Sequence, residues 1–433
     1  MRNHHNVEQV RSRGGQLACG LDFGTSNSTL GVYDDAGPRL IPLEGDHLTV
    51  PSAVFFGVEA QTAFLIGRTA VSSYIDDVGG RLMRSLKSIL GSTLIDERTS
   101  VYRRRLKFSE VIGLYIAELK QRAENAQGGP LERVVMGRPV HFVDNDADAD
   151  QYAENTLRDV ARAVGFRDIS FQYEPVAAAL AFERQHVSGE KIALIADIGG
   201  GTSDFTVVRL NGDVQACDER KSDILANDGV RLGGTDFDRQ LSMQTFMPAF
   251  GYRTLMKRGD IEVPSAPFWD LSTWSSVHTL YDPKRLSELK DVRFEAQQPA
   301  LIERLMQVIE MRRGHSILIE VEKAKITLSD QKVATTSLHW LAPELSVSAT
   351  CEGFEDCAQP LLDKLKQTAH ACVRTAGLMN TSIDFVFFTG GTSQIPSVRA
   401  GILSQFENAI AVDGDRFGAV GLGLAIEAKR RYG

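Results

Sequence analysis

The sequence predicts an α/β protein made of two domain-sized halves, each with a mixed sheet. Residues 17–35 (LACGLDFGTSNSTLGVYDD) and 194–213 (LIADIGGGTSDFTVVRLNGD) follow one pattern: an apolar strand, an aspartate, a glycine turn with Thr-Ser, and a second strand. The two aspartates, Asp22 and Asp197, are separated by far more chain than one solenoid repeat contains. We therefore expect two halves that each open with the same hairpin.

Strands and helices alternate after each hairpin, which is typical of an α/β fold. In the first half a strand ends near Pro139, a helical stretch covers 150–166, and Glu174-Pro175 stands between the next strand and an alanine-rich helix. In the second half an amphipathic helix covers about 357–378, and the chain closes with a glycine-bearing helix. Two long stretches break this alternation, and we expect them to be inserted subdomains.

The expected organisation is a short leader followed by two lobes with a cleft between them. The leader has no apolar core, so it does not resemble a signal peptide. The predicted boundaries are: leader 1–16; lobe I 17–188, with an inserted subdomain at about 37–127 and completion by 413–433; lobe II 189–412, with an inserted subdomain at about 230–345.

The composition is that of a globular protein, with 43% hydrophobic and 24% charged residues. The net charge of -8 disfavours nucleic acid as the main partner, because phosphate backbones attract clustered Lys and Arg. No run of about 18 apolar residues occurs, so no membrane partner is expected. The 5 cysteines are scattered and form no CxxC pair, which favours a reducing compartment. We expect a monomer of the cytoplasm.

Three apolar strands end in glycine turns that suit phosphate binding. The turns begin at Asp22, Asp197 and Gly390, and each contains a threonine. A glycine backbone lets several amide N–H groups point at one anion without a side chain in the way. An aspartate cannot bind phosphate, but it can hold Mg²⁺, usually through water. Two such loops facing each other would clamp a nucleoside triphosphate, whereas one Gly-Gly turn alone is equally well explained as a plain hairpin.

Competing motifs are absent from the sequence. It contains no G-x-x-x-x-G-K-[ST], no G-x-G-x-x-G after a strand, no H-E-x-x-H and no G-x-S-x-G. The acidic run DNDADAD at 144–150 lacks the glycine and the closing glutamate of an EF-hand, so we interpret it as a solvated loop.

Seven ordered segments resemble the actin-like ATPases, and within them the nucleotide-binding domain of DnaK-type heat-shock chaperones, the heat shock protein 70 family. The resemblance covers the chain from about 17 to 430. The segments are GLDFGTSNS, LKSILG, GRPVHF with YEPVAAALAF, ADIGGGTSDFTVV, LGGTDFDRQL, VEKAKITLS and FFTGGTSQIPSVR. The resemblance implies an ATP-hydrolysing cleft between two lobes, each with an RNase-H-like mixed sheet, and ATP or ADP with Mg²⁺ as ligands.

The resemblance also assigns roles by position. Asp22 and Asp197 would orient hydrated Mg²⁺, Lys87 would hold the attacking water, and Glu174 would lie near that water. The residues expected at the γ-phosphate are Thr202 and, as a proton acceptor, Asp204. The residues expected to bind the nucleotide are Gly24, Thr25, Ser26, Asn27, Gly199, Gly200, Gly201, Thr202, Gly233, Gly234, Glu322, Lys325, Gly390, Gly391 and Thr392.

The sequence departs from the family pattern in several places, including the region 250–315. It ends at Gly433, where the ATPase domain of the family ends, so we expect the peptide-binding domain to be missing. The family has an arginine soon after the proline that matches Pro139, where it relays the nucleotide state. Here the acidic run 144–150 occupies that region, which predicts loss of the relay. The adenine-stacking arginine of the family falls on Ile326, which predicts a weaker stacking contact.

The leading hypothesis is a Mg²⁺-dependent ATPase or ATP-driven switch of chaperone type, with unfolded protein or a co-chaperone as partner. Three alternatives stay open: a small-molecule kinase of the same fold, an actin-like filament protein, and a nucleotide-binding scaffold without useful turnover. The KSILG segment that begins at Lys87 favours the chaperone hypothesis over the kinase hypothesis. Ile326 keeps the scaffold hypothesis open.

Overall fold

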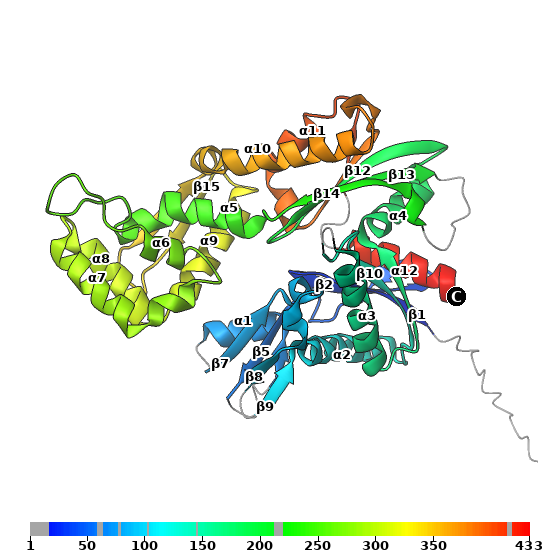
Figure 1. Cartoon of the computed structure of the whole chain (residues 1–433), viewed down its shortest axis with the longest axis horizontal. Coiled ribbons are helices and arrows are strands. Elements are labelled where there is room, and N and C mark those ends of the chain that lie inside the picture. Colours follow the sequence, from blue (N-terminus) through cyan, green and yellow to red (C-terminus); the bar gives the residue numbers. More distant parts are fainter. Residues whose placement is uncertain are drawn as a thin grey trace, which may run out of the picture.

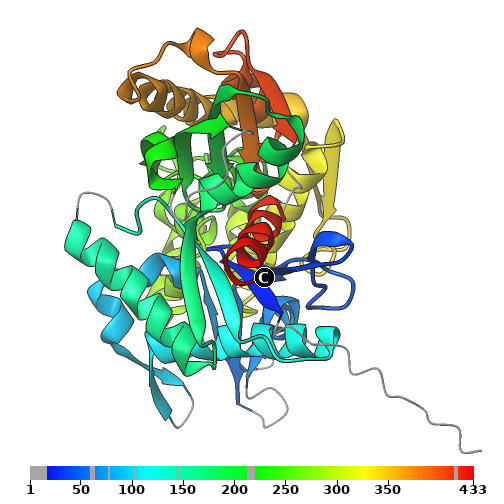
Figure 2. The same cartoon turned by 90° about the vertical axis from the view of Figure 1, so that its right-hand side faces the viewer.

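The structure is a computed structural model that describes residues 17–58, 64–76, 79–101, 104–143, 146–211, 220–413 and 418–433. Its two largest sheets form the centres of two lobes, and helices pack on both faces of each sheet (Figure 1). Figure 2 shows the C-terminal helix lying between the upper and lower parts of the molecule. The predicted leader 1–16 lies outside the described residues.

The sheet of lobe I has the strand order β11-β10-β1-β2-β3, and β4 pairs with β2. β1 and β2 form an antiparallel hairpin, whereas β1, β10 and β11 run parallel. The strands are β1 (Ala18–Phe23), β2 (Asn27–Asp34), β3 (Gly37–Leu40), β4 (Val50–Pro51), β10 (Arg133–Arg138) and β11 (Asp168–Tyr173).

The sheet of lobe II repeats this plan in the order β14-β13-β12-β17-β18. β12 and β13 form the antiparallel hairpin, and β12, β17 and β18 run parallel. The strands are β12 (Glu190–Ile198), β13 (Ser203–Asn211), β14 (Ile224–Val230), β17 (Phe385–Thr389) and β18 (Ile410–Asp413). The predicted pair of matching hairpins, each opening a mixed sheet, is confirmed.

Lobe I is packed from both sides. α2 (Phe108–Gln127) and α3 (Ala147–Ala163) cover one face, where Val134 and Met136 of β10 point into the core. α4 (Glu174–His186) and α12 (Ala419–Tyr432) cover the other face, on the side of Val135. A Cβ atom at Gly423 would lie 1.8 Å from the Ala177 carbonyl oxygen, so glycine permits the close approach of α12 to α4.

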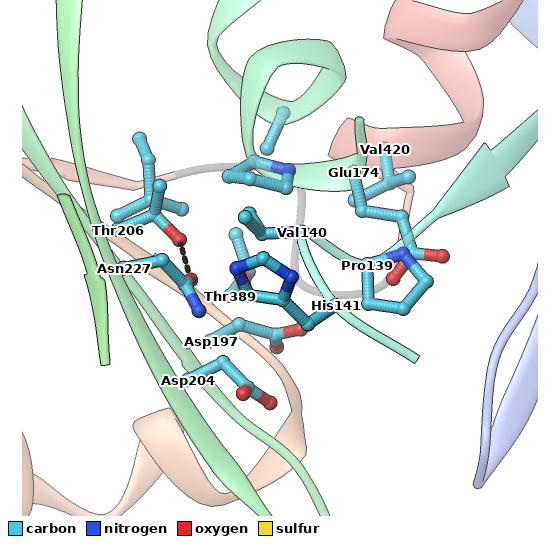
Figure 3. A pocket seen from close by; sticks show the side chains of 13 residues that line it. Pro139, Val140, His141, Glu174, Asp197, Asp204, Thr206, Asn227, Thr389 and Val420 are labelled. Atoms are coloured by element: carbon cyan, nitrogen blue, oxygen red, sulfur yellow. Dashed lines mark hydrogen bonds between the residues drawn. The ribbon is translucent and has the colours of Figure 1, made fainter. Parts of the chain in front are cut away.

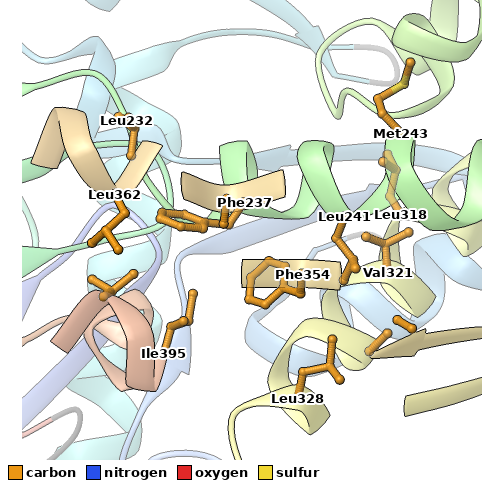
Figure 4. Packing of buried hydrophobic residues seen from close by; sticks show 14 of the residues in the cluster. Leu232, Phe237, Leu241, Met243, Leu318, Val321, Leu328, Phe354, Leu362 and Ile395 are labelled. Carbon is orange, nitrogen blue, oxygen red and sulfur yellow. The ribbon is translucent and has the colours of Figure 1, made fainter. Parts of the chain in front are cut away.

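Lobe II packs α5 (Gly234–Leu241), α10 (Cys351–Thr375) and α11 (Pro396–Leu403) on one face of its sheet. Figure 4 shows this core, in which the rings of Phe237 on α5 and Phe354 on α10 lie 6.3 Å apart. The opposite face packs against α4 through Ala179 and Phe182. Because α4 also contacts the sheet of lobe I, this one helix joins the two lobes.

The remaining elements belong to the stretches expected to be insertions. In the first half they are β5 (Ala53–Gly57), β6 (Leu65–Ile66), α1 (Gly67–Ile75), β7 (Gly80–Arg84), β8 (Arg98–Val101) and β9 (Arg104–Lys107). In the second half they are α6 (Ala266–Leu271), α7 (Pro283–Glu295), α8 (Pro299–Glu310), α9 (Gly314–Leu328) and β15 (Val333–Ser337). The partner strand of β15, β16 (Ser346–Thr350), follows directly after the expected insertion. The predicted domain boundaries stay a prediction. No helix in the described part of the chain combines the length and apolar character that a membrane span requires.

Candidate functional site

Four charged side chains from separate elements interact between the lobes. Asp22 lies near the end of β1, Asp197 near the end of β12, and Glu174 is the first residue of α4. Lys87 belongs to the short 3-10 helix η2 (Leu86–Ile89). Its Nζ lies 2.5 Å from Glu174 Oε1, and only 8% of the Lys87 side chain is exposed. The fold thus pairs two predicted catalytic residues that are 87 positions apart in the sequence.

The charges in this cluster are strongly coupled. Burial, reinforced by Glu174 and only partly offset by Lys87, raises the pKa of Asp22 to about 7. Burial and Glu174 also raise the pKa of Asp197, although the hydroxyl of Thr389 acts against this shift. Burial disfavours the charged form of Lys87, but the surrounding carboxylates outweigh it and raise the Lys87 pKa. Lys87 therefore stays protonated at neutral pH.

This donor set suits a divalent cation. Three carboxylates face one ammonium, and carboxylate oxygens are ligands that Mg²⁺ accepts. Among the residues that the structure describes, no three His, Cys, Asp or Glu side chains are grouped as direct ligands of one ion. Mg²⁺ usually keeps several of its waters, so Asp22 and Asp197 fit the ion as partners of those waters.

The first glycine turn, residues 24–27, connects β1 to β2. A Cβ atom at Gly24 would lie 2.2 Å from the carbonyl oxygen of Asn27, so the turn requires glycine. The Ser52 hydroxyl donates to the Gly24 carbonyl at 2.7 Å and holds the turn in place. Thr25 is partly exposed, so a ligand in the cleft can reach it.

The second and third glycine turns are joined by hydrogen bonds. The Gly199 carbonyl accepts from the Gly234 N–H at 2.9 Å and from the Thr392 hydroxyl at 2.7 Å. Gly390 has a φ of 78°, and a Cβ atom there would lie 2.4 Å from the Ile198 carbonyl oxygen. These turns form one compact unit, in which the Thr392 hydroxyl already has a protein acceptor.

The first and second turns approach each other from opposite lobes. A Cβ atom at Gly200 would lie 2.7 Å from Ser26 Oγ. A Cβ atom at Gly233 would lie 2.5 Å from the amide nitrogen of Gly201, so Gly233 supports the second turn closely. Gly201 and Thr202 are exposed and accessible to a ligand. The predicted facing pair of loops is therefore present in the fold.

Two of the residues expected to bind the nucleotide, Glu322 and Lys325, lie on α9. Lys325 Nζ lies 2.8 Å from Asp238 Oδ1 and donates to the Gly234 carbonyl at 3.2 Å. Burial raises the pKa of Asp238 to about 6, although Lys325 opposes the shift. Ile326 is 58% exposed and Glu322 is partly exposed. The sequence reasoning missed Asp238, although it lies one helical turn after Gly234 in the segment LGGTDFDRQL.

A cavity of about 40 Å³ lies beside the charged cluster. That is room for a few water molecules at roughly 10–15 Å³ each. Figure 3 shows Pro139 and Glu174 on one side of this space and Asp204, Thr206 and Asn227 on the other. The lining residues that the sequence reasoning did not name as site residues include His141, Thr206, Asn227 and Thr389. Three of them, His141, Thr206 and Thr389, lie in segments that resemble the family, but only the fold brings them to this cavity.

The inserted segments of the two lobes also touch. The Tyr74 hydroxyl on α1 lies 3.1 Å from His315 Nδ1 on α9, and the two rings are edge to face. The Arg84 guanidinium carbon lies 4.9 Å from the centre of the Trp274 ring. Burial, with His278 and Arg84 nearby, lowers the pKa of His315 to about 4, so His315 is neutral at pH 7. The inserted segments thus add an aromatic contact between the lobes to the contacts made by the charged cluster, the facing turns and α4.

Two lobes with one strand order, and glycine turns facing each other between them, define a protein of the actin-like ATPase fold. The model of a family described as Hsp70 protein matches residues 18–256 and 306–433. The chain belongs to the Hsp70 family.

A curated relative is the chaperone protein HscA homolog of Bordetella petrii, which is 26% identical over 432 residues. The match covers 95% of this chain but 58% of the length of that relative. The likeness to a protein named as a chaperone agrees with the family assignment.

Proposed function

We propose that this protein binds ATP with Mg²⁺ between its lobes and hydrolyses it slowly, as the switch of a chaperone. The observation that carries the proposal is the buried Lys87–Glu174 pair, held at 2.5 Å beside Asp22 and Asp197. Phosphoryl transfer to water depends mainly on positioning and on neutralising charge. The Lys87 ammonium, held in place among carboxylates between two glycine turns, supplies both the positioning and the neutralising charge.

The roles of the residues follow from their positions. Asp22 and Asp197 would hold the waters of Mg²⁺, and the ion when bound would place positive charge on the phosphate oxygens. Lys87 would hold the attacking water, and Glu174 keeps the Lys87 ammonium in place. Thr202, exposed at the second turn, would contact the γ-phosphate. Asp204 would accept the proton. The glycines of the three turns, Glu322 and Lys325 would contact the nucleotide.

The chaperone role and the partners are part of this proposal. The relative with a chaperone name supports a chaperone role, in which unfolded protein or a co-chaperone would be the partner. The cytoplasmic location stays a prediction from the sequence. Small-molecule kinase activity has less support, because the KSILG segment around Lys87 and the membership of the Hsp70 family both favour the chaperone branch.

The test is ATP turnover by the Lys87→Met variant, with Mg²⁺ present. We expect kcat to fall by ~100-fold or more, because removing one charge that acts in the transition state has effects of that size. The matched control is Lys323→Met, which removes an exposed lysine on α9 that pairs with Glu320. Turnover that Lys87→Met leaves at the level of Lys323→Met would contradict the proposal.

A further inference from the structure

Arg138, the residue immediately before Pro139, is buried, and its guanidinium donates hydrogen bonds to several acceptors. Its Nε donates to the Pro139 carbonyl at 3.1 Å, and Nη2 donates to the Val140 carbonyl at 3.4 Å. Nη2 also lies 2.7 Å from Asp150 Oδ2, and Nη1 lies 2.5 Å from Glu154 Oε2. One guanidinium therefore joins the start of α3 to the backbone that follows β10.

Two aromatic rings complete the surroundings of Arg138. Its guanidinium carbon lies 5.3 Å from the centre of the Phe142 ring and 5.1 Å from that of Tyr173. Burial disfavours the charge, but Asp150 and Glu154 outweigh it and raise the pKa of Arg138. The flat guanidinium can bind several acceptors in its plane while it stacks on rings, which a lysine ammonium cannot do.

Asp150 also binds the backbone that follows Pro139. Its Oδ1 accepts from the Phe142 N–H at 2.5 Å, while its other oxygen binds Arg138. Asp150 closes the acidic run that the sequence predicted to be a solvated loop without a relay function. In the fold, that end of the run lies in the first turn of α3 and is paired with a buried arginine.

The backbone from Pro139 to Phe142, which Arg138 and Asp150 bind, and Tyr173 both lie next to the catalytic cluster. Pro139, Val140 and His141 wall the cavity opposite Asp204, as Figure 3 shows. Tyr173 stands opposite Arg138 in the pairing of β10 with β11, and the next residue is Glu174, the partner of Lys87. A displacement of Arg138 would therefore disturb the Lys87–Glu174 pair in two ways, through Tyr173 and through the backbone that follows β10.

We propose that Arg138, held by Asp150 and Glu154, is a positioning residue for the Lys87–Glu174 pair and for the 139–141 wall of the cavity. This inference rests on the proposed ATP hydrolysis. Arg138 acts through Tyr173 and through the backbone it binds. The acidic start of α3 is then a structural part of the site, linked to it by ion pairs.

The first experiment compares Arg138→Met with Arg158→Met. Arg158 is the matched control, because it binds the same Glu154 at 2.8 Å and stacks on Phe171 of β11, but its backbone acceptor is Ile169. We expect Arg138→Met to lower kcat by about 10–100-fold, because small misplacements of catalytic groups have such effects, with KM for ATP within about 2-fold. Arg158→Met should leave kcat within about 2-fold.

The second readout is hydrogen exchange at the amides of residues 140–143 in the nucleotide-free protein. Arg138→Met and Asp150→Asn should both speed exchange at Phe142 by about 10-fold or more, because the side chain that accepts from its amide is no longer held by the Arg138–Asp150 ion pair. Asp148→Asn, an exposed acid of the same run, should not. Arg138→Lys should fail to restore either kcat or slow exchange, because it lacks the planar fork.

The outcomes separate this inference from the proposed function. No ATP turnover in the unaltered protein would overturn the proposed function. Turnover that falls equally in Arg138→Met and Arg158→Met, or in neither, would overturn only the positioning role. If Arg138→Met does not fold, Asp150→Asn against Asp148→Asn decides the question by the same two measurements.

Discussion

The two lobes have the same five-stranded plan, but the equivalent aspartates in their central strands have different neighbours. In lobe II, Asp197 stands opposite Thr389 on the parallel strand β17, and the Thr389 hydroxyl favours the charged carboxylate. In lobe I, the register of β1 with β10 puts Gly137 in the corresponding place beside Asp22. A Cβ atom at Gly137 would lie 3.0 Å from Glu174 Cγ, so glycine there makes room for a second carboxylate.

This difference explains the charge of the site. The repeated hairpin supplies an aspartate from each lobe, but the neighbouring parallel strand gives a hydroxyl donor to Asp197 alone of the two. Burial and Glu174 raise the pKa of both aspartates, to about 7 for Asp22, whereas at Asp197 the Thr389 hydroxyl opposes the rise.

The largest difference between the lobes is expected at the turn glycines. Gly24 and Gly199 are each two residues after their aspartate, but a Cβ atom would lie 2.2 Å from the Asn27 carbonyl in the first turn and 3.4 Å from the Thr202 carbonyl in the second. We expect Gly24→Ala to lower the free energy of unfolding by ~1–3 kcal/mol through overpacking, and Gly199→Ala to lower it by less than ~1 kcal/mol. Urea unfolding measures both. Equal losses would mean that the two turns are not packed differently.

A smaller difference is expected between Asp22→Asn and Asp197→Asn in the absence of nucleotide and Mg²⁺. Because Asp22 keeps its proton in the folded state between its ordinary pKa of 3.8 and about 7, the unaltered protein loses stability as the pH rises through that window. Asp22→Asn removes this loss, so its unfolding temperature at pH 7.5 should exceed that of the unaltered protein by a few degrees.

Asp197→Asn should raise the unfolding temperature less, and both gains should disappear near pH 4, where the unaltered carboxyl is neutral too. Thermal unfolding at several pH values provides the measurement. A stabilisation by Asp22→Asn that is the same at pH 4 and pH 7.5 would show that charge is not its cause.

The smallest effect is expected from Thr389→Val, which makes the surroundings of Asp197 more like those of Asp22. Loss of the hydroxyl should raise the pKa of Asp197 further and weaken Mg²⁺-dependent nucleotide binding by ~0.5–1.5 kcal/mol, the usual worth of one hydrogen bond. Calorimetric titration with Mg²⁺ and ADP measures this. The control is Thr206→Val in the same cavity, because the Thr206 hydroxyl binds Asn227. Equal weakening by both variants would count against a specific role for Thr389.

Much of the fold could be predicted because its signals are local. The paired strand-aspartate-glycine pattern at Asp22 and Asp197 indicated two matching hairpins, and the sheets confirm them. The side chains that complete the site could not be predicted in the same way. His141, Asn227 and Asp238 lie in segments whose local sequence does not show which lobe or helix they will face.

The sequence by itself determined the class of fold and the family, because alternating apolar strands and glycine turns act within a few residues of each other. Only the tertiary structure decided the electrostatics of the site. The Lys87–Glu174 pair joins residues 87 positions apart. Strand register and burial determine whether Asp22 lies near Glu174 and whether Arg138 pairs with Asp150. A carboxylate pKa responds to those distances and to exclusion of water, and neither is encoded in the residues next to it in the chain.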